Sequence, residues 1–167
     1  YDVAFSYHNN ASAAETVLAA IRATGRKALA VQADVSVEAD VLSMFKTVDE
    51  QFGRLDALVN NAGMLEKQMR LDQMDVARWQ RVLGANVIGT FLCAKEAVLR
   101  MSTKHGGKGG VIVNMSSAAA RLGSPNEFID YAAAKGAVDS MTLGLAKEVA
   151  TEGIRVNAIR PGLIYTD

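Results

Sequence analysis

The length, composition and charge of the chain limit the kinds of protein it can be. It has 167 residues, half of them apolar, which is enough to bury one substantial core and too few for two ordinary domains. We therefore expect one domain over residues 1–167. The 18 basic and 18 acidic side chains cancel, which argues against a surface for nucleic acid or anionic lipid and favours small-molecule partners.

The chain has a single cysteine, Cys93, which cannot form an internal disulfide. The sequence shows no charged-then-apolar leader and no long membrane-spanning run, so a reducing cytoplasm is the expected compartment. Because Cys93 lies in an apolar helical stretch, we interpret it as a small buried hydrophobe without chemistry.

Short apolar runs bounded by turn residues alternate with longer segments of helical period. This pattern predicts repeated strand–helix units and a parallel sheet. The expected strands cover residues 3–7, 28–32, 57–60, 111–115 and 155–159. The expected helices cover residues 11–24, 37–52, 74–83, 87–103 and 131–151. The strands are almost continuously apolar, which is typical of a sheet with helices on both faces.

Local signals predict how these elements begin, end and connect. Ser36 is the expected N-cap of the helix over residues 37–52, and Gly25, Gly53 and Gly153 are expected to end helices. The Gly-rich stretch over residues 105–110 precedes a strand instead of following one, so it is interpreted as a flexible connector and not as a phosphate loop.

Two of the expected helices, over residues 87–101 and 132–150, are apolar on more than one face. A helix that is apolar nearly all round must be covered on both sides. We expect a second subunit to supply the cover that the sheet does not.

Tyr131 and Lys135 stand four residues apart in a helical segment, so their side chains leave the same face about one turn apart. A cation within about 6 Å stabilises a phenolate and lowers the phenol's pKa, which makes tyrosine an acid/base near neutral pH. Alone, such a pair is more often a solvated surface pair.

Polar residues follow three of the expected strands: Asn60–Gly63, Ser116–Ser117 and Arg160–Gly162. In open α/β sheets, ligands bind at the carboxyl ends of the strands. The three ends therefore predict a nucleotide crevice at one edge of the sheet.

These motifs together resemble those of the short-chain dehydrogenase/reductase family, and the resemblance covers essentially the whole chain. It is carried, in chain order, by Asn60-Asn-Ala-Gly63, Asn86, Ser117, Tyr131-Ala-Ala-Ala-Lys135 and Pro161-Gly162. It implies a Rossmann-like, doubly wound parallel sheet in a single NAD(P)-binding domain. It also implies an enzyme that moves hydride between a nicotinamide and a carbonyl or alcohol, assembled as a homo-oligomer, either a tetramer or a dimer.

The resemblance assigns roles to four residues. Tyr131 is the proton donor or acceptor, and Lys135 lowers its pKa and holds the nicotinamide ribose. Ser117 would hydrogen-bond the substrate oxygen, and Asn86 would anchor a water in a proton relay. Ser116 is less favoured than Ser117 because neighbouring residues of a strand point to opposite faces. No metal site is assigned.

The resemblance also assigns cofactor contacts. Besides Tyr131 and Lys135, these fall on His8, Asp34, Val35, Asn60, Ala62, Gly63, Pro161, Gly162, Ile164 and Thr166. A simple turn or cap residue is an equally good interpretation of Asp34.

The choice between the two nicotinamides depends on the end of the first expected strand, where an acidic residue would select NAD. Residues 6–10 contain no acid, so NADP is favoured, with NAD possible. His8 stands where many NADP-using relatives have arginine, and an exposed loop histidine is as good an interpretation of it as a phosphate contact.

The chain opens inside what resembles the family's second strand and stops where the substrate-covering loop would follow. The family's first strand lies between strands resembling residues 3–7 and 57–60. Without it, two rows of backbone groups lack partners and the sheet should not close. We therefore expect a portion of a polypeptide of about 250 residues. If the 167 residues were the whole molecule, it should be inactive.

Two other functions fit parts of the pattern. A non-catalytic dinucleotide-binding regulatory protein would have no need for Tyr131, Lys135, Ser117 and Asn86 together. A sugar-nucleotide epimerase or dehydratase would have a larger substrate domain. Among substrates, the resemblance leans toward those of 3-oxoacyl reductases and sugar dehydrogenases without choosing between them.

Overall fold

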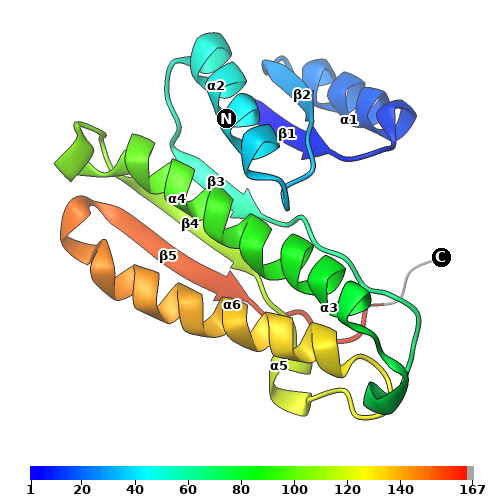
Figure 1. The fold of residues 1–167 in the computed structure, drawn as a ribbon. Coiled ribbons are helices and arrows are strands. Elements are labelled where there is room, and N and C mark those ends of the chain that lie inside the picture. Colours follow the sequence, from blue (N-terminus) through cyan, green and yellow to red (C-terminus); the bar gives the residue numbers. More distant parts are fainter. Residues whose placement is uncertain (165–167) are drawn as a thin grey trace.

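The structure, a computed structural model, describes residues 1–164 and shows strands alternating with helices (Figure 1). The strands are β1 (Val3–Tyr7), β2 (Ala28–Gln32), β3 (Ala57–Asn60), β4 (Gly110–Met115) and β5 (Ile154–Ile159). The helices are α1 (Ala11–Ala23), α2 (Glu38–Phe52), α3 (Val76–Leu83), α4 (Gly89–Met101), α5 (Ala119–Leu122) and α6 (Ile129–Glu148). The predicted α/β class is confirmed.

All strand pairings in the described residues are parallel. β1 pairs with β2, while β3, β4 and β5 form a second sheet in that order. Within residues 1–164, β1 and β3 are not hydrogen-bonded to each other. The sheet is therefore divided at the place where the sequence predicts that it should not close.

One face of the β3–β4–β5 sheet carries the main core. α4 and α6 lie across this face (Figure 1), where Ile112 and Val156 pack with Ala97, Met101 and Val149 from the helical side. On the opposite face, Val59 and Ile159 are about half exposed. Helices on both faces were expected from the apolar strands, but among the described residues the helices cover one face of this sheet.

A second cluster joins α2 to α4. Val41 and Phe45 from α2 pack against Cys93, which is buried as predicted. Burial raises the pKa of the Cys93 thiol to about 11, so the thiolate is disfavoured at neutral pH. Cys93 is thus a small core residue.

The helix ends agree with the sequence in part. Gly53, in the left-handed conformation with φ 71°, ends α2 as expected. Ser36 does not cap α2, because the residue before the helix is Val37 and the Ser36 hydroxyl donates to the Asp34 carboxylate instead. That Asx-type turn satisfies Ser36 before the helix starts.

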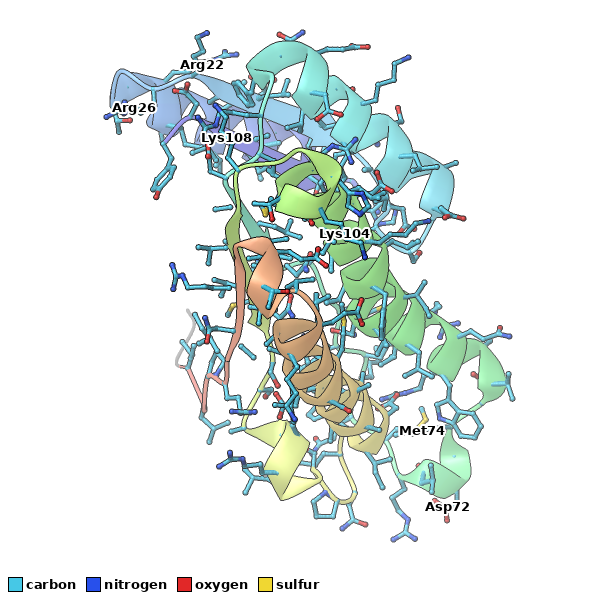
Figure 2. All side chains as sticks on the ribbon, turned by 90° about the vertical axis from the view of Figure 1, so that its left-hand side faces the viewer. Arg22, Arg26, Asp72, Met74, Lys104 and Lys108 are labelled. Carbon is cyan, nitrogen blue, oxygen red and sulfur yellow. The ribbon has the colours of Figure 1, made fainter. Side chains whose placement is uncertain are left out.

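α3 and α4 form one continuous helical rod, Val76–Met101, through a π-helical turn at Gly84–Ile88. Figure 2 shows its extent, from Asp72 and Met74 before its start to Lys104 beyond its end. The rod is long and apolar enough to cross a membrane, which the sequence analysis did not anticipate. Its packing on β3, β4, α2 and α6 is that of a core helix.

The Gly-rich stretch before β4 connects α4 to this strand, as predicted, and it is closely packed. Gly107 N–H donates to the Ser102 carbonyl, and Gly109 N–H donates to the Met101 carbonyl. A Cβ atom on Gly107 would lie 2.4 Å from the Met101 backbone. Glycines are needed here because the chain passes directly against the end of α4.

Candidate active site

The carboxyl ends of β3, β4 and β5 lie at one edge of the sheet, beside the first turns of α6 (Figure 1). Parallel strands bring the segments that follow them to the same edge. The segments after β4 and β5 are joined there by a hydrogen bond from Ala118 N–H to the Pro161 carbonyl (2.9 Å). The edge is thus a continuous surface of loops.

Tyr131 and Lys135 lie on the same side of α6 at this edge. The Lys135 ammonium nitrogen is 5.4 Å from the centre of the Tyr131 ring, so the two side chains converge. Lys135 is almost completely buried and donates to the Met115 carbonyl at the end of β4 (2.8 Å). Burial lowers the pKa of Lys135, because the low-dielectric surroundings disfavour its charge.

The two serines after β4 point in different directions. Ser116 is buried, and its hydroxyl donates to the Lys135 carbonyl (3.2 Å). Ser117 is half-buried, and its Oγ accepts the Ala119 N–H (3.1 Å). Ser116 is therefore engaged in the core, whereas the Ser117 side chain remains partly accessible.

Asn86 lies in the π-helical turn between α3 and α4. Its amide nitrogen donates to the Met64 and Val82 carbonyls (2.8 and 2.9 Å). The side chain is fully buried, and its Oδ1 has no hydrogen-bond partner among the described residues. Such π turns widen a helix locally and are common at functional sites.

Gly63 leaves the space in which Asn86 and Lys135 come together. A Cβ atom at Gly63 would lie 2.6 Å from Asn86 Oδ1 and 3.6 Å from Lys135 Nζ. Glycine is therefore required here by close packing. The arrangement puts an unsatisfied acceptor and a buried ammonium on the same side of the loop that follows β3.

The Asn60 side chain does not face the crevice. It donates to Asn114 Oδ1 (2.9 Å), Asn114 donates to Thr142 Oγ1 (2.9 Å), and the Thr142 hydroxyl donates to the Val138 carbonyl (2.7 Å). This buried chain ties β3 to β4 and α6. The Asn60 side chain therefore has a structural role, which no motif in the sequence indicates.

After β2, hydrogen bonds hold Asp34 and packing holds Val35. Asp34 accepts the Ser36 N–H (2.9 Å) and hydroxyl (2.7 Å), and these bonds lower the pKa of its carboxyl. Its geometry is that of the turn residue considered as an alternative. The Val35 side chain packs closely against Gly89 at the start of α4.

His8 lies exposed after β1, with Nε2 3.7 Å from the Asp34 carboxylate. An acidic residue from the segment after β2 therefore lies beside the end of β1, although residues 6–10 contain none. Only the folded chain shows this, because the two residues are far apart in sequence.

The other predicted cofactor residues lie on the segments that follow β3 and β5. Ala62, Gly63 and Ile164 are exposed after their strands, and Pro161 and Gly162 lie on the segment that follows β5. Thr166 falls outside the described residues.

The structure also shows an ion pair next to Tyr131 that no sequence motif indicates. Arg78 from α3 reaches across to Asp130, the residue before Tyr131. The pair is 52 positions apart in sequence and carries no motif, so no sequence signal could have found it.

Comparison with known proteins identifies the family. The protein-family model described as "short chain dehydrogenase" matches residues 1–167. The chain belongs to the short-chain dehydrogenase family. The sequence of this short-chain dehydrogenase is 53 % identical to the uncharacterized oxidoreductase YgfF of Escherichia coli over all 167 residues. It is 41 % identical to a 3-oxoacyl-[acyl-carrier-protein] reductase of Synechocystis sp., covering 99 % of the chain.

Solved structures of the family have the same fold. A short-chain dehydrogenase from Burkholderia cenocepacia in complex with NADP is 35 % identical, with a TM-score of 0.90 over 99 % of this chain. The chain spans 68 % of the length of the E. coli relative, 65 % of the Synechocystis relative and 65 % of the B. cenocepacia structure. The fold predicted from the motifs, including its partial extent, is confirmed.

Proposed function

We propose that this protein is an NADP-preferring oxidoreductase that interconverts a carbonyl and an alcohol, with Tyr131 as the acid/base. The proposal rests above all on the convergence of Lys135 Nζ on the Tyr131 ring, 5.4 Å away, at the edge where three strands end. A solvated surface pair, the alternative for this spacing, would not bury the lysine.

Each polar group at the edge has a task in this chemistry. The Tyr131 hydroxyl gives a proton to the substrate oxygen during reduction and takes it back during oxidation. The charge of Lys135 favours the phenolate form of Tyr131. The Ser117 hydroxyl donates a hydrogen bond to the same substrate oxygen as negative charge develops on it.

Asn86 gives this site a route for protons. Its Oδ1 is buried without a hydrogen-bond partner in residues 1–164, and buried acceptors of this kind commonly bind ordered water. Because Oδ1 and Lys135 Nζ meet beside Gly63, a water held by Asn86 would be in reach of the ammonium. The proton lost by Tyr131 can then be replaced from solvent.

The residues present fit a nicotinamide dinucleotide. The loop after β3 exposes backbone at Ala62 and Gly63, where a nucleotide can approach closely. Lys135 and the segment Pro161–Ile164 would hold the nicotinamide end, and His8 and Asp34 the adenosine end. When bound, the nicotinamide supplies or accepts the hydride.

NADP is favoured over NAD by two observations. No acidic residue occurs in residues 6–10 themselves, where an acid would bind the free ribose hydroxyl and repel a phosphate, and the nearby Asp34 carboxylate is already engaged by Ser36. The B. cenocepacia structure, 35 % identical, contains NADP.

The test is a panel of carbonyl substrates with the full-length protein, followed through nicotinamide absorbance. The panel includes a 3-oxoacyl thioester and a sugar, because relatives at 41 % identity are a 3-oxoacyl reductase and glucose 1-dehydrogenase 2 of Bacillus subtilis. We expect turnover with at least one carbonyl and a higher kcat/KM with NADPH than with NADH. Nucleotide binding without turnover on any substrate would contradict the enzymatic function. A preference for NADH would contradict the cofactor assignment alone.

We also propose that a second copy of the chain covers the outer faces of α4 and α6. Phe91 and Leu99 on α4 are each about half exposed, and with Met141 and Leu145 on α6 they line an apolar groove between the helices. Exposed apolar patches of this kind mark protein interfaces.

Light scattering at micromolar concentration tests this interface. We expect an oligomer in the unaltered protein and a shift toward monomer in Phe91→Glu. Val17→Glu on α1 is the matched control, because Val17 is 46 % exposed and Phe91 49 % exposed. A monomeric unaltered protein, or equal behaviour of the two variants, would contradict the interface.

A further inference from the structure

The ion pair between Arg78 and Asp130 is buried beside Tyr131. The Arg78 side chain is 4 % exposed and the Asp130 side chain 3 % exposed. Arg78 Nε donates to Asp130 Oδ2 (2.6 Å) and Nη2 donates to Oδ1 (3.3 Å), which makes a two-pronged contact. Nη1 donates to the Lys67 carbonyl (2.6 Å), so the guanidinium also holds the loop that follows β3.

Both partners are charged in this setting. Burial alone would raise the pKa of Asp130, but the hydrogen bonds from Arg78 and from the Tyr131 N–H lower it on balance. The hydrogen bond to Asp130 raises the pKa of Arg78. A buried pair of this kind adds little to stability compared with apolar residues of the same volume, because desolvation offsets the attraction. Stability alone therefore gives a weak reason for the pair.

The position of the pair suggests a different role. Asp130 Oδ1 accepts the backbone N–H of Tyr131 (2.9 Å), and the residue before α6, Phe128, supplies no side-chain cap. The Asp130 carboxylate is therefore the side chain that fixes the first turn of α6, and Arg78 in turn fixes the carboxylate.

The loop before α6 needs such an anchor. Ser124 (φ 42°) and Asn126 (φ 63°) both adopt the left-handed conformation, which is strained for residues other than glycine. This strained loop is tied to the segment after β3: Met69 N–H donates to the Glu127 carbonyl (2.9 Å), and Arg70 donates to Asn126 Oδ1 (3.3 Å). Arg78 makes a further connection next to Tyr131, because it binds both the Lys67 carbonyl after β3 and the Asp130 carboxylate in the first turn of α6.

We propose that Arg78 and Asp130 are positioning residues for Tyr131. The pair holds the first turn of α6 against α3 and the loop after β3, and so sets the Tyr131 hydroxyl relative to Lys135 and Ser117. This inference rests on the proposed function, because it gives the pair a kinetic consequence only if Tyr131 is the acid/base.

Arg78→Lys tests the proposal, since it keeps the charge and removes the two-pronged geometry. We expect kcat to fall by about ten- to a hundred-fold, because small misplacements of a reacting group have effects of this size. The Kd for NADPH should stay within about two-fold, because the nucleotide contacts are not altered.

Arg100→Lys is the matched control. Arg100 also makes a two-pronged contact, with Asp49, and donates to the Glu96 carboxylate and carbonyl. It lies at the far end of α4, away from Tyr131. Arg100→Lys should lower the thermal midpoint without changing kcat. Equal kcat in the two variants would overturn the proposal.

A double variant covers the case in which Arg78→Lys does not fold. Arg78→Met combined with Asp130→Leu removes both charges together and leaves none uncompensated, so it should fold. It also removes the acceptor for the Tyr131 N–H, so kcat should still fall. A folded double variant with an unchanged kcat would overturn the proposal.

Amide hydrogen exchange supplies a readout that does not need turnover. In Arg78→Lys, exchange over residues 129–135 should be faster, while the rest of α6 and the whole of α6 in Arg100→Lys remain as in the unaltered protein. If the unaltered protein shows no turnover, the proposed function fails. The amide hydrogen exchange then decides by itself whether Arg78 and Asp130 hold the first turn of α6. Unchanged exchange over residues 129–135 would overturn the proposal, as would faster exchange with an unchanged kcat.

Discussion

Tyr131→Phe is expected to abolish measurable turnover while leaving the affinity for NADPH nearly unchanged. The substitution removes only the hydroxyl that exchanges a proton with the substrate oxygen, and general acid/base catalysis contributes about 10²–10⁴-fold. The ring remains, so its packing against the Lys135 ammonium, 5.4 Å from the ring centre, is retained. The measurements are kcat for the best carbonyl of the panel and the Kd for NADPH from fluorescence.

Tyr1→Phe is the matched control for this variant. Tyr1 is 88 % exposed and precedes β1 at the amino end of the strand, which is opposite the carboxyl ends where the site lies. It should behave as the unaltered protein. Turnover retained in Tyr131→Phe would contradict the mechanism. Loss of NADPH affinity together with turnover would instead indicate a binding role for the hydroxyl.

The strands were predicted closely because their signal is local. β1, β2 and β3 have the predicted bounds, and β4 and β5 each begin one residue earlier than expected. Runs of apolar residues between turn residues define a buried parallel strand whatever lies around it. The approach of Lys135 to Tyr131 followed in the same way, from their spacing of four residues in a helix.

Features that depend on tertiary contact were not predictable. The short helix α5 lies within a stretch with no helical period. The sequence predicts two separate helices over residues 74–83 and 87–103, whereas in the structure the π turn at Gly84–Ile88 joins α3 and α4 into one rod. The Asn60–Asn114–Thr142 chain and the Arg78–Asp130 pair each join residues from different elements. A buried polar residue cannot be told from an exposed one in sequence until its partner is known.

The same contrast applies to Asn60, which the resemblance places along the cofactor without giving a direction for its side chain. The motif Asn60–Gly63 predicts a loop after β3, and the structure has a loop there in which Ala62 and Gly63 are exposed. Motif position does not tell which way a side chain at the end of a strand points. In the structure the Asn60 amide turns inward to Asn114, and its role is to hold the strands together.

Gly63→Ala is expected to lower both stability and turnover. The added methyl group would lie 2.6 Å from Asn86 Oδ1, closer than van der Waals contact allows. Asn86 cannot move aside freely, because its amide is held by the Met64 and Val82 carbonyls. Either those bonds break or the loop after β3 shifts, at a cost of about 1–3 kcal/mol for overpacking. Displacement of Asn86 or of the loop should reduce kcat by about ten-fold or more.

Gly136→Ala is the matched control, because it makes the same change in the same region. Gly136 lies inside α6, directly after Lys135, and a Cβ atom there meets nothing within 4 Å. Alanine favours a helix over glycine by roughly 0.5–1 kcal/mol, so this variant should unfold at a slightly higher temperature with kcat unchanged. The measurements are thermal unfolding and kcat for both variants. If Gly63→Ala behaved like Gly136→Ala, the contact between Gly63 and Asn86 would not be a constraint on the site, and the proton route through Asn86 would lose its structural support.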